Sequence, residues 1–116
     1  MFKKLRTVIY HVDDLQKAKR WYTETTGIAP YFDAPFYVGF NINGFELGLD
    51  PDFEDVERGA QAVAYWQVDD IEAAVKKFIN AGALLNSKVK EVGGGIKVAV
   101  VLDPWGNAVG LIEENL

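Results

Sequence analysis

The chain has 116 residues, a length typical of one domain, and its 49% hydrophobic and 25% charged residues indicate a globular protein. It contains no cysteine and one histidine, His11, which excludes disulfides, thiolate metal sites and cysteine nucleophiles. A formal net charge of -5 argues against a nucleic-acid partner, because an acidic surface repels phosphate backbones. The first residues lack the apolar core of a signal peptide and no apolar run reaches the roughly 18 residues of a membrane span, so we expect a cytoplasmic protein with no membrane partner.

The first half of the chain begins with a strand signal followed by a helix signal. β-branched and aromatic residues over Thr7–Val12 predict the strand. Asp13 is expected to cap the helix N-terminus with Gln16 at the third helical position, and Gly27 to end the helix. Apolar residues recur at helical spacing in between, so we expect one face of this helix to be buried.

Three further strand signals complete a β-α-β-β-β module. Asn43-Gly44 is a hairpin signal that joins the last two strands. The predicted strands are Tyr31–Phe32, which is the weakest, Phe36–Ile42 and Phe45–Leu49.

The second half of the chain repeats the first. Val68-Asp69-Asp70-Ile71 overlays Val12-Asp13-Asp14-Leu15 with an offset of 56 residues, and Gly106–Leu111 overlays Gly44–Leu49 with an offset of 62. The second copy is expected to hold a helix between Asp69 and Gly82 and then the strands Leu85–Lys90, Ile96–Leu102 and Ala108–Ile112.

We therefore predict an α+β fold built from two tandem βαβββ modules. Module one covers residues 1–50, an acidic connector covers 51–61 and module two covers 62–116. Two copies are too few for a solenoid, so both belong to a single domain, 1–116.

The order of these motifs resembles the vicinal oxygen chelate superfamily, which includes glyoxalase I, bleomycin-resistance proteins, fosfomycin-resistance proteins and extradiol dioxygenases. The resemblance is carried by the duplicated module, by the Val-Asp-Asp-Leu entry into the helix and its repeat at Val68, and by Asp103-Pro104-Trp105-Gly106 before the last strand. It implies a curved mixed sheet around a cavity and a homodimer.

Metal-dependent members of that superfamily hold a divalent cation between His or Gln on the first strand and Glu on the last strand of each module. The positions of this chain that match those ligands are Thr7, Gly48, Val63 and Gly110. None of them supplies an imidazole or carboxylate donor, so we expect no metal and no other cofactor. The alternative is a divalent metal at a displaced site formed by His11, Gln67 and Glu46.

Strand alternation assigns one face of each module to the cavity, and aromatic residues near 31–40 and in the last turn extend that face. The candidate ligand-binding residues are Thr7, Ile9, His11, Phe36, Tyr37, Phe40, Glu46, Gly48, Asp50, Val63, Tyr65, Gln67, Trp105, Ala108 and Gly110. Glu46 and His11 are the candidate catalytic residues, and burial would raise the pKa of Glu46 toward neutrality.

The two functional classes that follow are a binding protein and an enzyme. The first is a metal-free protein that sequesters a small aromatic or cationic ligand, since an aromatic wall beside carboxylates suits such molecules. The second is a lyase-, isomerase- or dioxygenase-type enzyme that uses Glu46 or His11, either without metal or with the displaced metal site. A dimeric interaction module without a small ligand is a third possibility. The unsuited residues at the metal-ligand positions favour the first class.

Overall fold

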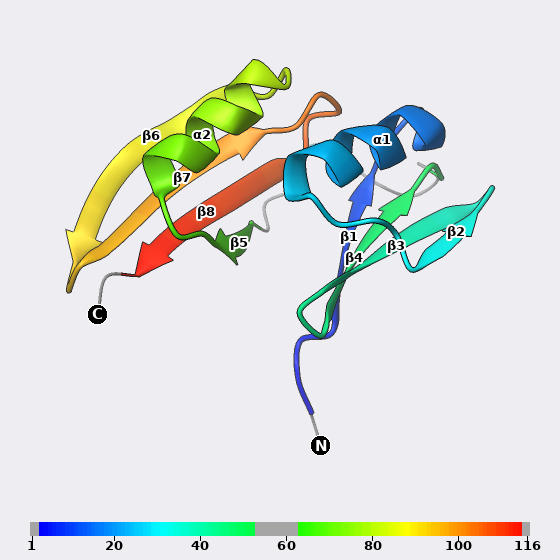
Figure 1. Cartoon of the computed structure of the whole chain (residues 1–116), viewed down its shortest axis with the longest axis horizontal. Coiled ribbons are helices and arrows are strands. Elements are labelled where there is room, and N and C mark those ends of the chain that lie inside the picture. Colours follow the sequence, from blue (N-terminus) through cyan, green and yellow to red (C-terminus); the bar gives the residue numbers. More distant parts are fainter. Residues whose placement is uncertain (1–2, 53–62, 115–116) are drawn as a thin grey trace. The chain divides into compact units, whose positions relative to one another are not determined.

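Two units with the same topology make up the chain. The computed structural model describes residues 3–52 and 63–114, and the chain divides into unit one, residues 1–57, and unit two, residues 58–116. Residues 53–61 of the predicted acidic connector lie outside the described residues. Each unit consists of one four-stranded sheet and one helix that lies along one face of that sheet (Figure 1).

Unit one contains a strand, a helix and then three strands. These are β1 (Thr7–His11), α1 (Leu15–Thr26), β2 (Phe32–Ala34), β3 (Tyr37–Ile42) and β4 (Phe45–Asp50). The strands lie in the order β1-β4-β3-β2, with β1 parallel to β4 and the other pairs antiparallel.

Unit two has the same succession of elements. These are β5 (Ala64–Gln67), α2 (Ile71–Asn80), β6 (Leu84–Gly93), β7 (Ile96–Leu102) and β8 (Ala108–Glu114). Their order, β5-β8-β7-β6, and their directions match those of unit one. The prediction of an α+β fold with two tandem βαβββ modules is therefore confirmed, with one separate sheet in each module.

The strand registers reproduce the offsets of the sequence repeat. Ile9 of β1 lies opposite Gly48 of β4, and Tyr65 of β5 lies opposite Gly110 of β8. Tyr65 follows Ile9 by 56 residues and Gly110 follows Gly48 by 62, as the two overlaid segments predict. The repeat thus extends to the pairing of individual residues.

Both helices begin one residue later than predicted. Asp14 and Asp70, rather than Asp13 and Asp69, have extended backbones and accept a hydrogen bond from the backbone N–H three residues ahead, each at 3.1 Å. The reason is that the apolar Leu15 and Ile71 start the buried helix faces, so the aspartate directly before each of them takes the cap position.

The helix ends follow the glycine signals. Gly27 ends α1 with a positive φ of 75° and donates its backbone N–H to the carbonyl of Thr23. In unit two the helix ends at Asn80 with Ala81 as its C-cap, and Gly82 follows with a φ of 108°.

Each hydrophobic core lies between a helix and its own sheet. In unit one the fully buried residues include Tyr22 of α1, Phe40 of β3 and Leu47 of β4. Side chains alternate along a strand, so every second residue points to the opposite face of its sheet. Within the described residues of each unit no helix covers that face, and we call it the helix-free face. Among the described residues, no helix is long and apolar enough to cross a membrane.

Candidate functional site

The helix-free face of unit one is organised around the carboxylate of Glu46 on β4. Glu46 Oε1 accepts a hydrogen bond of 2.5 Å from the hydroxyl of Tyr31, and Oε2 accepts one from the hydroxyl of Tyr37. Nη1 of Arg6 lies 3.6 Å from Oε1. The side chain of Glu46 is 10% exposed, so both tyrosines donate to a carboxylate that is largely shielded from water.

Two glycines make room for these tyrosines. Gly39 of β3 and Gly48 of β4 lie opposite each other in the register. A Cβ atom on Gly48 would lie 1.9 Å from the Tyr37 hydroxyl oxygen, and one on Gly39 would lie 3.1 Å from a ring carbon of Tyr31. Neither glycine has a positive φ, so space rather than backbone conformation requires glycine at both positions.

A tyrosine also covers the corresponding glycine of unit two. Tyr65 of β5 lies opposite Gly110 of β8, and a Cβ atom on Gly110 would lie 2.6 Å from Cδ1 of Tyr65. Gly48 and Gly110 are the positions that match the last-strand metal ligands of the resembled superfamily. A tyrosine side chain lies over each of them.

The two positions that match the first-strand metal ligands, Thr7 and Val63, also lack a suitable donor for a cation. Val63 has no donor atom, and the hydroxyl of Thr7 already accepts a 2.8 Å hydrogen bond from Nη1 of Arg6. The residues at the four matching positions therefore do not fit a divalent metal, which needs imidazole or carboxylate donors.

The charge state of Glu46 differs from the prediction. Hydrogen bonds from Tyr31 and then Tyr37 lower the pKa of Glu46, and they outweigh the burial that would raise it. The predicted upward shift is therefore wrong. Burial and the bond to Glu46 raise the pKa of Tyr37, and the bond to Glu46 raises the pKa of Tyr31. At neutral pH the cluster is a carboxylate with two protonated phenol donors.

His11 lies away from this cluster. Glu46 is opposite Thr7, whereas His11 is four residues further along β1 and opposite Asp50, a separation of about 13 Å at roughly 3.3 Å per residue. Nδ1 of His11 lies 2.9 Å from the carbonyl oxygen of Asp52 and donates to it, since a carbonyl can only accept. His11 and Glu46 therefore do not come together to hold a metal or share a proton, and Gln67 lies in unit two.

An exposed group of aromatic side chains, the aromatic surface, adjoins Glu46. It consists of Tyr31, Phe32, Phe36 and Tyr37, of which the first three are 58%, 42% and 67% exposed. The ring of Phe32 lies 6.2 Å from that of Phe36 and 6.1 Å from that of Tyr37, measured between centroids. These are the separations of interacting aromatic pairs, so the rings form one apolar surface beside the carboxylate.

Two predicted aromatic residues do not join this surface. Phe40 lies opposite Leu47 in the register, so it points to the helix side of the sheet and is fully buried. Trp105 belongs to unit two and is 8% exposed, in the turn where the carboxylate of Asp103 accepts its backbone N–H at 2.9 Å. Core packing accounts for both side chains.

The other predicted residues divide between the two helix-free faces. Thr7, Ile9, His11, Glu46, Gly48 and Asp50 share the face in unit one, as their registers show. The face in unit two holds Tyr65, Gln67 and Gly110, together with Ala108 at the start of β8 and Val63 directly before β5.

Sequence reasoning missed four residues that shape the site, namely Arg6, Tyr31, Phe32 and Gly39. Tyr31 lies just before β2, and its backbone N–H bonds to the carbonyl of Gly39. This contact places its ring above Gly39 and its hydroxyl at Glu46. The aromatic content of residues 31–40 was the available signal, but the pattern did not specify the pairing of so short a strand.

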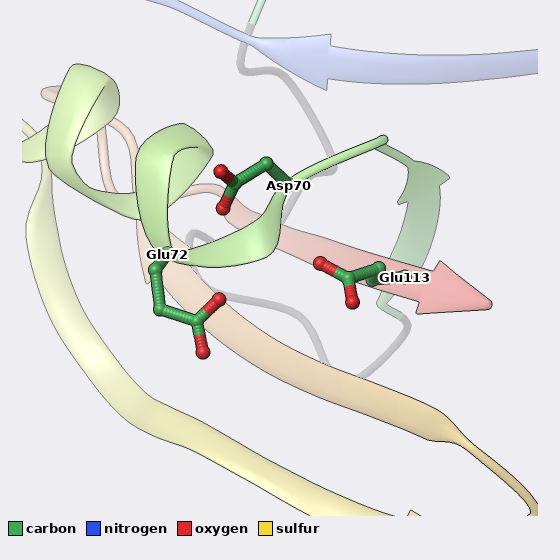
Figure 2. Close-up of side chains that lie close together, drawn as sticks. All are labelled: Asp70, Glu72 and Glu113. Carbon is green, nitrogen blue, oxygen red and sulfur yellow. The ribbon is translucent and has the colours of Figure 1, made fainter. Parts of the chain in front are cut away.

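An acidic cluster lies at the start of α2 in unit two. Carboxylate oxygens of Asp70, Glu72 and Glu113 lie within 4.8 Å of one another, and Glu113 reaches from β8 toward the first residues of the helix (Figure 2). Glu113 accepts the backbone N–H of Ile71 at 2.8 Å, Asp70 caps the helix, and Glu72 lies 3.6 Å from Nζ of Lys97. These contacts explain the cluster as an anchor for the helix N-terminus.

Comparisons with known proteins identify the family. The model of the Glyoxalase/Bleomycin resistance protein/Dioxygenase superfamily matches residues 4–111. None of the curated proteins matches the chain.

Several solved structures share the fold. A glyoxalase-related enzyme from Fulvimarina pelagi is 22% identical with a TM-score of 0.81, covering 97% of this chain and 89% of that one. A glyoxalase/bleomycin resistance protein/dioxygenase family enzyme from Burkholderia phytofirmans PsJN is 19% identical with a TM-score of 0.83, covering 97% and 100%. The fosfomycin resistance protein FosX from Listeria monocytogenes is 15% identical with a TM-score of 0.79, covering 100% and 97%.

Proposed function

We propose that this protein, which belongs to the Glyoxalase/Bleomycin resistance protein/Dioxygenase superfamily, binds a small flat aromatic molecule without a metal ion. The observation that carries the proposal is the position of Tyr37. Its hydroxyl occupies the space that a side chain at position 48 would need, and it donates to Glu46. A carboxylate ligand at that position is thus replaced by a phenol.

The aromatic surface supports a flat ligand in preference to a cationic one. Exposed rings of Tyr31, Phe32 and Phe36 offer stacking contacts. Glu46, which would attract a cation, already accepts two phenol hydrogen bonds and lies beside Arg6. A cationic ligand would have to compete with that guanidinium, whereas a flat aromatic ring would not.

Binding is better supported than catalysis. A carboxylate with a lowered pKa is a weak base, and Glu46 has two donors that favour its charged form. His11 is too distant to assist it. The enzyme alternative, a lyase, isomerase or dioxygenase, would need a base or a metal ligand set that these residues do not supply.

Two further expectations belong to this proposal. We expect a second copy of the chain as a protein partner, because the resemblance to the superfamily implies a homodimer. We also expect the protein in the cytoplasm. Light scattering coupled to size-exclusion chromatography gives the oligomeric state directly.

The binding proposal is tested with two uncharged amides of similar size. Benzamide and cyclohexanecarboxamide are titrated into the isotopically labelled protein with and without EDTA, and amide chemical shifts are followed by NMR. Benzamide should bind more tightly and shift residues around Tyr31 and Phe36. Phe36→Ala should weaken benzamide binding, while Val92→Ala, which truncates an exposed side chain in β6, should not. Equal affinity for the two amides, or binding that EDTA abolishes, would contradict the proposal.

A further inference from the structure

A small pocket adjoins Glu46 at the β3–β4 hairpin, and it carries positive charge. Its lining includes Lys4, Arg6, Tyr31, Asn41, Phe45 and Glu46, and its volume is about 180 Å³. We infer that this hairpin pocket binds the carboxylate of a small aromatic acid, so that the ligand is a planar aromatic carboxylate. The inference rests on the proposed function, because it assigns a ligand class to the same face of unit one.

The charges lining the pocket favour an anion. The chain as a whole carries a formal net charge of -5, yet this pocket has two cationic side chains and one carboxylate. That carboxylate, Glu46, is already bonded to Tyr31 and Tyr37. A local excess of positive charge on an acidic protein attracts and retains an anionic group.

Arg6 has the donors that a carboxylate requires. Its contacts with Thr7 and Glu46, at 2.8 Å and 3.6 Å, both use the single nitrogen Nη1. A guanidinium carries five N–H donors in a planar fork that matches the two oxygens of a carboxylate. Lys4 adds an ammonium group, which has three N–H donors; its Nζ donates to the carbonyl of Gly44 at 3.2 Å and lies 5.5 Å from the centre of the Phe45 ring.

The walls and the size of the pocket suit a single aromatic ring. Phe45 is 53% exposed and Tyr31 is 58% exposed, so both side chains leave aromatic surface accessible in the pocket. Tyr31 also belongs to the aromatic surface, which makes the pocket continuous with the proposed binding face. A volume of about 180 Å³ lies below the roughly 300–1,000 Å³ of pockets for drug-sized ligands and fits a one-ring acid.

The test compares benzoate with benzamide, which has the same ring and no charge, and with cyclohexanecarboxylate. We expect benzoate to bind about ten-fold more tightly than benzamide, since a charged hydrogen bond in such a site contributes more than one to an uncharged amide. We expect cyclohexanecarboxylate to bind more weakly than benzoate. Raising the salt concentration should weaken benzoate binding and leave benzamide binding unchanged.

Single substitutions identify the cationic side chain that causes the preference for benzoate. Arg6→Gln should remove the preference for benzoate over benzamide, and Lys4→Gln should reduce it. Arg20→Gln is the matched control, because it removes the same charge from an exposed position in α1. It should leave both affinities unchanged. NMR spectra of each variant report whether the fold is retained.

The outcomes separate this inference from the proposed function. Binding of benzamide with no preference for benzoate overturns the carboxylate pocket and leaves the aromatic binding face standing. A preference that Arg20→Gln reduces as much as Arg6→Gln also overturns the pocket, because it would then reflect net charge alone. If neither ring compound binds, the proposed function and the inference both fail.

Discussion

Gly48 and Gly110 have the same local role in two different sheets. Each lacks a Cβ atom on the helix-free face, and a tyrosine side chain lies where that atom would be. The two tyrosines are not equivalent in the repeat, since Tyr65 corresponds to Ile9 whereas Tyr37 comes from β3. Different strands of the two units therefore cover the same pair of positions.

Adding a methyl group at Gly48 tests this close packing. Gly48→Ala should lower the free energy of unfolding by about 1–3 kcal/mol, because its Cβ atom would overlap the Tyr37 side chain. In a Tyr37→Ala background the same substitution should cost less, since the obstructing ring is gone. Urea denaturation of the four proteins in the cycle measures the coupling.

Gly110→Ala provides the control for that cycle. Its Cβ atom would meet Tyr65 rather than Tyr37, so its effect should add to that of Tyr37→Ala. Additive effects for Gly48→Ala and Tyr37→Ala would show that the hydroxyl does not fill this space.

The lowered pKa of Glu46 predicts a dependence of stability on pH. A carboxyl group whose pKa in the folded state lies below its ordinary value of 4.5 stabilises the fold above that pH. This stabilisation is lost as the pH falls through the folded-state pKa. Tyr37→Phe removes one hydrogen-bond donor to the carboxylate, so it should lower the free energy of unfolding by about 1 kcal/mol at pH 7. The free energy of unfolding of this variant should also fall less on acidification than that of the unaltered protein.

Urea denaturation at stepwise lower pH checks this dependence. Tyr65→Phe serves as the control, because Tyr65 lies in unit two and Glu46 in unit one. The control should keep the acid dependence of the unaltered protein. An unchanged dependence in Tyr37→Phe would mean that this bond does not hold the Glu46 pKa down.

At the scale of elements, the second of two consecutive aspartates caps the helix N-terminus in both units. Asp70→Ala should lower the free energy of unfolding by about 1 kcal/mol, since the cap to the Ala73 N–H is lost. Asp69→Ala is the matched control and should have a smaller effect. Thermal and urea denaturation of both variants show which aspartate stabilises the helix start. A larger effect of Asp69→Ala would mean that Asp69 is the cap, as the sequence predicts.

The elements with strong local signals are the ones that could be predicted. Asn43-Gly44 has positive φ at both residues, as its hairpin signal requires, and Gly27 ends its helix in the same way. β6 was predicted to be shorter, as Leu85–Lys90, because its alternation is interrupted by register shifts along its pairing with β7. β2 has three residues, too few for a periodic pattern to define its bounds.

At the scale of the whole molecule, the sequence repeat was enough to predict both modules. Residues that correspond in the repeat also occupy corresponding places in the strand pairing. The face that holds Glu46 was also predictable, because alternation follows from the strands. Tyr37 of β3 was among the predicted residues, but Tyr31 and Arg6 were not, since they reach Glu46 from outside the strands β1 to β4. Phe40 was included because of the aromatic content of residues 31–40, whereas the hairpin register places it opposite the buried Leu47.

The central claim is that this superfamily member binds its ligand without a metal, and metal content tests it most directly. The protein is produced with zinc, nickel, manganese and iron supplied, dialysed and analysed by mass spectrometry alongside Glu46→Gln. We predict that none of these metals is present in stoichiometric amount. A stoichiometric metal in the unaltered protein would contradict the account, and its loss in Glu46→Gln would assign that metal to the Glu46 carboxylate.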